Sequence, residues 1–157
     1  MGSHEIPADS KAKEYFDLAM ADFDQATELD ANYDLAFDMK GLIGMANENY
    51  DQAIADFTQE MRIKPAYGRL RLTDAYCNRG SFYQRQNQYN EAISDYEKSI
   101  EFQSSRDGCS CEPYNPLAWI YLQREEYKNG WDVINKAKKA KVKIDPELIK
   151  KLKTEIH

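Results

Sequence analysis

The side chains in this sequence that could bind a metal or carry redox chemistry are three cysteines. Cys109 and Cys111 lie in the loop "DGCSCEP" (107–113), and Cys77 lies earlier in the chain. Together they could bind zinc or form a redox pair, but three thiolates without a nearby histidine make an incomplete zinc site. We therefore expect ordinary free thiols, and keep a disulfide and then a metal as the alternatives.

The sequence places no histidine where it could serve acid–base or triad chemistry. His4 belongs to the opening "MGSHEIP", which is typical of an expression tag, and His157 is the last residue. Such chemistry needs a group held within hydrogen-bond reach of its partner. Carboxylates are plentiful, but their spacing follows exposed helix faces. We predict that the protein is not an enzyme and uses no cofactor or metal.

The charge of the chain argues for a protein partner. Its 157 residues carry 21 Lys and Arg against 27 Asp and Glu, a net charge of -6. This balance does not favour nucleic acid or an anionic membrane, and no apolar run approaches the roughly 20 residues that would cross a bilayer. Three cysteines are too few for a disulfide scaffold, which favours the cytoplasm, although removal of a secretion leader would leave the same sequence.

A ten-residue pattern recurs along the chain. The segment "ENYDQAIADF" (48–57) returns as "NQYNEAISDY" (87–96), with an earlier copy around 16–23 and a weaker one at 127–134. The matching residues are mostly apolar or small and recur at steps of three and four, which places them on one side of a helix. Four such helices indicate a repeat architecture. In the two clear copies the matching residues are Tyr50, Ala53, Ile54, Asp56 and Phe57, and Tyr89, Ala92, Ile93, Asp95 and Tyr96.

Each of the last three copies is preceded by a second helical segment against which it can bury its apolar side. These segments are 33–46, 73–86 and 115–124. Small residues in them permit a close approach between helices. The matching positions are Phe37, Gly41 and Gly44 in the first segment, Tyr76, Gly80 and Tyr83 in the second, and Ala118 and Tyr121 in the third.

With these residues the chain resembles the tetratricopeptide repeat family, whose 34-residue helix-turn-helix unit keeps such aromatic, small and Pro positions in this order. The resemblance covers roughly residues 14–141, with departures. Glu60 stands where a small residue is usual, and the second and third repeats are 39 residues apart, so the extra residues in "AYGRLRL" are expected to lengthen a helix. The resemblance implies an all-α, right-handed α-solenoid of about three full repeats, an N-terminal half repeat and a C-terminal capping helix.

The expected boundaries follow from these segments. Residues 1–8 are a tag or disordered, and 9–157 form a single tetratricopeptide-repeat domain. Within it we expect a half repeat at 9–31, repeats at 33–65, 73–103 and 114–142, and a capping helix at 145–156. Asp145 and Pro146 suit the start of that last helix, which carries an apolar stripe of Ile149, Leu152 and Ile156.

The resemblance also implies a function: the first helices of the repeats line a concave groove that binds a peptide or protein segment. The segment 34–46 supports this, because it is apolar on both sides and a helix of that kind expects burial on both. The expected groove residues are Leu35, Asp38, Met39, Leu42 and Met45 in the second repeat, Asp74, Cys77, Asn78, Ser81, Gln84 and Arg85 in the third, and Asn115, Trp119, Leu122 and Gln123 in the fourth.

Two alternatives to a peptide-binding scaffold stay open. One is a self-assembly module, such as a homodimer, that buries the apolar groove and the unpaired first helix; unlike ends would attract, since residues 1–63 hold 4 basic and 14 acidic residues (-10) and 128–157 hold 9 and 4 (+5). The other is a redox or metal protein built on the cysteine loop.

Overall fold

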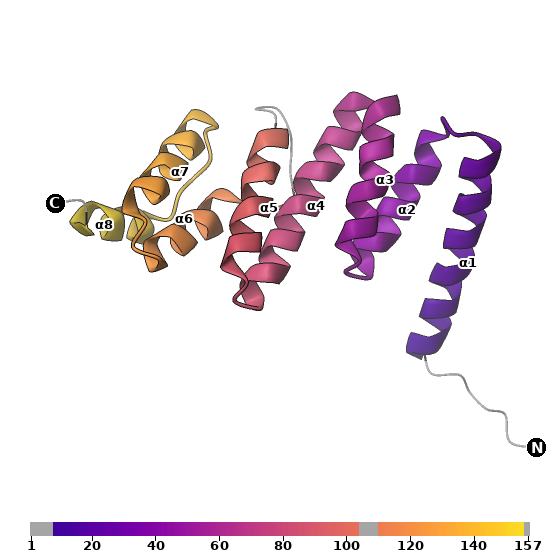
Figure 1. The fold of residues 1–157 in the computed structure, drawn as a ribbon, viewed down its shortest axis with the longest axis horizontal. Helices are drawn as coiled ribbons and strands as arrows, with labels where there is room; N and C mark the ends of the chain where they lie inside the picture. Colours follow the sequence, from indigo (N-terminus) through magenta and orange to yellow (C-terminus); the bar gives the residue numbers. More distant parts are fainter. Residues whose placement is uncertain (1–7, 104–109, 156–157) are drawn as a thin grey trace, which may run out of the picture. The chain divides into compact units, whose positions relative to one another are not determined.

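The computed structural model describes residues 8–103 and 110–155 and shows only helices and connecting turns over them (Figure 1). The chain falls into two compact units that meet between Gly68 and Arg69, and each is described by itself. The all-α prediction is confirmed, whereas the single domain over 9–157 and the handedness of a superhelix stay predictions. In chain order the helices are α1 (Ala8–Leu29), α2 (Asp34–Ala46), α3 (Tyr50–Ile63), α4 (Pro65–Arg85), α5 (Tyr89–Phe102), α6 (Tyr114–Gln123), α7 (Tyr127–Lys139) and α8 (Pro146–Glu155).

The turn between the two helices of a repeat has the same backbone conformation in all three repeats. In each turn one residue has a positive φ, between 56 and 60°, and lies two residues before the aromatic that begins the next helix. These residues are Glu48, Asn87 and Glu125. This left-handed residue ends the first helix with a Schellman motif, which satisfies carbonyl groups of the last turn. The motif's long bond runs from Asn49 N to Gly44 O, from Gln88 N to Tyr83 O and from Glu126 N to Tyr121 O, at 2.8, 2.9 and 2.9 Å.

The first unit packs α2 against α3 around a glycine. A Cβ added to Gly41 would lie 2.2 Å from the ring of Phe57, so the ring occupies the space that a side chain would need. Phe57, Ala36 and Ala53 are almost fully buried beside this contact. Helix α1 packs on α2 and donates no large side chain to the fully buried core.

The second unit repeats this arrangement and closes with α8. Gly80 of α4 faces the ring of Tyr96, which would lie 3.0 Å from an added Cβ. Helix α8 packs against both α6 and α7 and buries Leu148 and Leu152 completely. The capping helix is therefore present, although its buried pair is Leu148 and Leu152, with Ile149 half-buried. Ile156 lies outside the described residues.

Helix α4 is longer than the first helices of the other repeats, as the 39-residue spacing suggested. It has 21 residues, against 13 in α2 and 10 in α6. It begins at Pro65, directly after α3, so the helical part of the third repeat starts eight residues before the expected position 73. Gly68 in its first turns lies against the backbone of Met61, which only a glycine permits.

A buried ion pair occupies the same position in the second and third repeats. Arg79 binds Asp95 through Nε and Nη2, at 2.7 and 2.8 Å, and the two side chains are 16% and 4% exposed. Each cation precedes the repeat glycine, and each aspartate precedes the aromatic that packs on that glycine. The sequence pattern recorded the aspartates as a repeat but gave them no partner.

The matching ion pair in the first unit has a longer separation between its charged atoms, and its lysine also binds a second aspartate. Lys40 Nζ lies 3.5 Å from Asp56 Oδ1 and 2.7 Å from Asp24 Oδ1 on α1. Burial raises the pKa of Asp56 above its usual value, because its contacts with Gln52 and Lys40 offset only part of the lost hydration. Burial alone would lower the pKa of Lys40, yet the two aspartates together raise it. Lys40 thereby ties α1 to the α2–α3 pair.

The fourth repeat fills the same two positions with apolar side chains. Leu117 corresponds to Lys40 and Arg79, and Val133 corresponds to Asp56 and Asp95; both are buried. One chain therefore holds two solutions to a single packing problem, an ion pair and a pair of aliphatic side chains.

A disulfide corrects the expectation of three free thiols. Cys77 on α4 is bonded to Cys111, and their Cα atoms are 6.0 Å apart, within the usual separation of about 4.4 to 6.8 Å. Cys77 is fully buried, and Cys109 lies outside the described residues. The expected free thiols are therefore wrong for Cys77 and Cys111, and the argument from cysteine number for a reducing compartment falls away, because structural disulfides persist in oxidising ones.

We expect that both residues of the ion pair in the third repeat can be replaced together by apolar ones, but that replacing only one of them is strongly destabilising. Asp95→Val should lower the free energy of unfolding by about 3 kcal/mol, because it leaves a buried guanidinium without its carboxylate. Adding Arg79→Leu, which copies the fourth repeat, should recover most of that loss. Denaturant unfolding of both variants and of wild type measures the difference.

Glu147→Gln is the control, since it breaks the exposed 3.1 Å pair between Glu147 and Lys151. Its cost should stay below about 0.5 kcal/mol. An Arg79→Leu, Asp95→Val protein that is no more stable than Asp95→Val alone would contradict the equivalence of the two solutions.

The disulfide should be a main support of the second unit. It closes a loop of 34 residues, for which the chain-entropy estimate gives roughly 3 to 4 kcal/mol. Replacing Cys77 and Cys111 with Ala should therefore lower the melting temperature markedly, and reductant should then have no further effect. Cys109→Ser, which leaves the bond in place, is the matched control; three titratable thiols in the unreduced protein would refute the bond.

Candidate functional site

The expected groove residues of the second repeat form a continuous stripe on α2. We call this set the α2 stripe: Leu35, Asp38, Met39, Leu42 and Met45. It lies opposite the side of the helix that carries the buried residues Ala36, Lys40, Gly41 and Gly44. Leu35 is 48% exposed, and the other members are half-buried. The α2 stripe is thus an apolar surface with one carboxylate, and it is not used by the contact with α3.

The expected polar residues on α4 are engaged inside the second unit. Asn78 Nδ2 donates to the carbonyl of Asp74 at 2.8 Å. Ser81 Oγ donates to the carbonyl of Cys77 and lies 3.1 Å from the hydroxyl of Tyr96. That hydroxyl donates to Gln84 Oε1 at 2.7 Å, and burial raises the pKa of Tyr96, so it stays a donor at neutral pH.

Arg85 ends this row at the surface. It is exposed, and its guanidinium lies 5.9 Å from the centre of the Phe82 ring. Of the residues expected to form the polar end of the groove, Ser81 and Gln84 therefore serve the packing of α4 on α5 through Tyr96, whereas Asn78 bonds within α4. Arg85 alone among them is exposed.

The segment before α6 contacts the first of the expected groove residues on α4. Asp74 accepts hydrogen bonds from the backbone N–H groups of Ser110 and Cys111, at 2.9 and 3.3 Å. Cys77, one turn further, carries the disulfide to Cys111. Two positions expected to face a ligand hold part of the chain itself.

The expected groove residues on α6 hold the capping helix. Asn115 accepts from the backbone N–H of Asp145 at 2.9 Å and donates to the carbonyl of Lys143 at 3.2 Å. Trp119 packs against the core, and Lys151 of α8 lies 4.7 Å from the centre of its ring. Leu122 also packs against this core, whereas Gln123 is exposed. Asn115 and Trp119 thus contact α8 and its preceding turn, and their place in a ligand groove stays a prediction.

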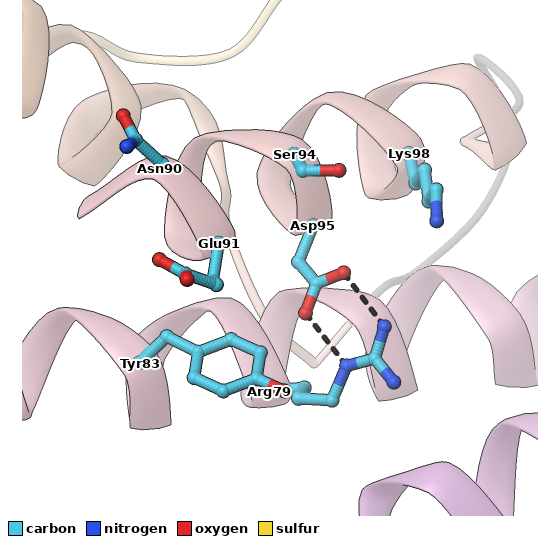
Figure 2. A pocket seen from close by; sticks show the side chains of 7 residues that line it. All are labelled: Arg79, Tyr83, Asn90, Glu91, Ser94, Asp95 and Lys98. Atoms are coloured by element: carbon cyan, nitrogen blue, oxygen red, sulfur yellow. Dashed lines mark hydrogen bonds and ion pairs between the residues drawn. The ribbon is translucent and has the colours of Figure 1, made fainter. Parts of the chain in front are cut away.

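A shallow cavity of about 350 Å³ lies between α4 and α5 and has mixed charge. Figure 2 shows Arg79 bound edge-on to Asp95 within it, and the guanidinium also lies over the rings of Tyr76 and Tyr83. The charge of Arg79 is therefore already paired within the protein. Its lining residues are Arg79, Tyr83, Asn90, Glu91, Ser94, Asp95 and Lys98.

Over the described ranges, 8–103 and 110–155, no three His, Cys, Asp or Glu side chains are grouped to hold a metal ion. In the same part of the chain, every helix is too short or too polar to cross a bilayer.

Comparison with known proteins gives a match in one repeat. Two similar solved structures are described as "MamA RS-1 ArsTM double mutant" and "Crystal structure of MamA". The first is 16% identical, with 83% of this chain and 68% of that chain covered and a TM-score of 0.47. The second is 17% identical, with 89% and 96% covered and a TM-score of 0.38. At these values neither likeness carries an argument about function.

No curated protein matches the chain significantly. The family model of the tetratricopeptide repeat matches residues 73–105, which include most of α4 and all of α5. These two helices contain the Gly80–Tyr96 contact on which the resemblance rested. The chain therefore carries a tetratricopeptide repeat at residues 73–105, and its resemblance to the tetratricopeptide repeat family is confirmed.

Proposed function

We propose that this protein is a non-catalytic interaction module that binds an apolar peptide or protein segment on the α2 stripe. Repeats of this family serve protein–protein interaction, and the proposal assigns that role to one surface of this chain. The observation that carries it is the position of Leu35, Met39, Leu42 and Met45 on the side of α2 opposite its buried residues.

The chemistry of the α2 stripe suits a ligand whose shape is not fixed in advance. Methionine side chains are unbranched and polarisable, so they adapt to different apolar partners. An extended or helical segment with apolar residues on one side fits this pattern.

The surfaces of the second unit support the same assignment by elimination. On α4 and α6 most of the matching positions contact the connector, Tyr96 or the capping helix, and only Arg85 and Gln123 among them are exposed. A ligand there would have to displace bonds that the protein already makes. On α2 no such bond involves the four apolar side chains, because they carry no hydrogen-bonding group apart from the weakly accepting thioether sulfur.

The proposal is tested by replacing both methionines of the α2 stripe. Met39→Ser with Met45→Ser should leave stability nearly unchanged if the side chains face a ligand, but should cost about 2 kcal/mol or more each if they belong to the core. Partner binding should weaken at least tenfold, about 1.4 kcal/mol, since apolar anchors carry much of the binding energy. Proteins that copurify with wild type are identified, and the dissociation constant of the most enriched one is measured.

Met20→Ser is the matched control, because Met20 is also half-buried but lies on α1. It should keep the affinity of wild type. A double variant that is stable and binds the partner unchanged would remove the α2 stripe from the function.

A further inference from the structure

Helix α1 exposes large apolar side chains. Tyr15 is 69% exposed, Leu18 56% and Leu29 81%, whereas Phe23 and Thr27 on another side of the helix are half-buried. Apolar side chains grouped on one helix face at this exposure mark an interaction surface. The question is what covers them.

The spacing of this face is that of a coiled-coil seam. We call its residues the α1 stripe: Lys11, Tyr15, Leu18, Asp22, Gln25 and Leu29, which recur at alternating steps of four and three. These steps are those of the a and d positions of a heptad, through which two helices pair side by side; Tyr15, Leu18 and Leu29 are apolar, and the other three positions are polar. A single helix on the surface of a repeat needs no such regularity, since a wider stripe serves a core.

The first four residues of the α1 stripe, in chain order, are cationic, aromatic, aliphatic and anionic, and the steps between them are four, three and four. This order is symmetric, so the four residues of one helix can pair with the same four residues of a second helix that runs in the opposite direction. In an antiparallel pair an a residue faces a d residue of the other helix. Lys11 then meets Asp22, and Tyr15 meets Leu18, twice each.

We propose that α1 pairs with α1 of a second copy in this antiparallel register. The contact is isologous, so it closes on a dimer and does not propagate into a filament. Two apolar layers lie at its centre and an ion pair lies at each end. Tyr15 and Leu18 of both copies lose their exposure to water, which supplies most of the attraction, and the charges fix direction and register.

Other arrangements of two copies pair fewer of the charged and apolar side chains of the α1 stripe with suitable partners. Pairing in parallel would set Lys11 against Lys11 and Asp22 against Asp22. The head-to-tail contact suggested by the charges of the two ends would bring the α1 stripe to a surface without apolar partners. Over the described residues, all exposed large apolar side chains lie in the first unit: Tyr15, Phe16, Leu18, Leu29, Tyr33, Leu35 and Tyr67.

The size of the contact limits its strength. Four apolar side chains and two exposed ion pairs form a small interface, so the dimer should dissociate in about the micromolar to millimolar range. Because its ion pairs are exposed, salt should weaken the association. The inference does not depend on the α2 stripe: Met39→Ser with Met45→Ser should leave it unchanged.

The test is charge reversal followed by sedimentation equilibrium of the full chain at low salt. Lys11→Glu places two acids opposite each other, and Asp22→Lys places two bases opposite each other, so each variant alone should dimerise at least tenfold more weakly than wild type. An equimolar mixture of the two should regain the dimer, because each end then pairs Glu with Lys or Asp with Lys. The protein carrying both changes should dimerise like wild type. Parallel pairing sets like charges against each other in wild type and in both single variants, so in that arrangement neither single change would weaken the dimer.

Asp17→Lys is the matched control, because it reverses an exposed charge of the same helix outside the α1 stripe. It should keep the dimerisation of wild type, and circular dichroism should show the same helicity for all variants. The proposal is wrong if wild type is monomeric throughout that concentration range, if Asp17→Lys weakens the dimer as much as Asp22→Lys, or if the mixture stays monomeric.

Discussion

The close approach of two helices at a residue without a side chain is the constraint on which each repeat depends. Phe57 lies where a Cβ of Gly41 would be, and Tyr96 lies almost as close to Gly80. This contact fixes the rotation of both helices about their axes. The residue before each glycine must then face the residue before each ring, which is why Arg79 and Asp95 meet in the core. The ion pair is thus a consequence of the glycine contact.

Buried ion pairs give little net stability, because both charges lose their hydration. They have a larger effect on the free energy of incorrectly packed structures. The helices of the second and third repeats are similar in sequence, so a helix could pack on the wrong partner or one turn out of register. A misplaced Lys40 or Asp95 would then be buried without a counter-ion, at several times the cost of a misplaced aliphatic side chain. In the last repeat, where α8 already fixes α6 and α7 from outside, Leu117 and Val133 suffice.

The sequence was sufficient for the parts of the fold that repeat. Periodic spacing and the glycine–aromatic pairs predicted the helices, the tetratricopeptide repeat at residues 73–105 and the long α4, because each signal is local or recurs. It did not predict the bond between Cys77 and Cys111, since that pairing depends on where a unique connector returns to α4. It also did not predict that Asn115 and Trp119 contact the capping helix, because a family template describes an open groove and says nothing of a chain's own connector or cap.

These departures bear on where a partner can bind. Helix surfaces in a repeat protein are available only where the chain's own connectors and caps leave them uncovered. The second unit uses the outer sides of α4 and α6 to hold residues 110–111 and α8, and both attachments are specific hydrogen bonds or a covalent bond. In the first unit only residues 30–33 connect α1 to α2. Its exposed apolar residues, Leu18 and Leu35 among them, therefore follow from connector length as much as from composition.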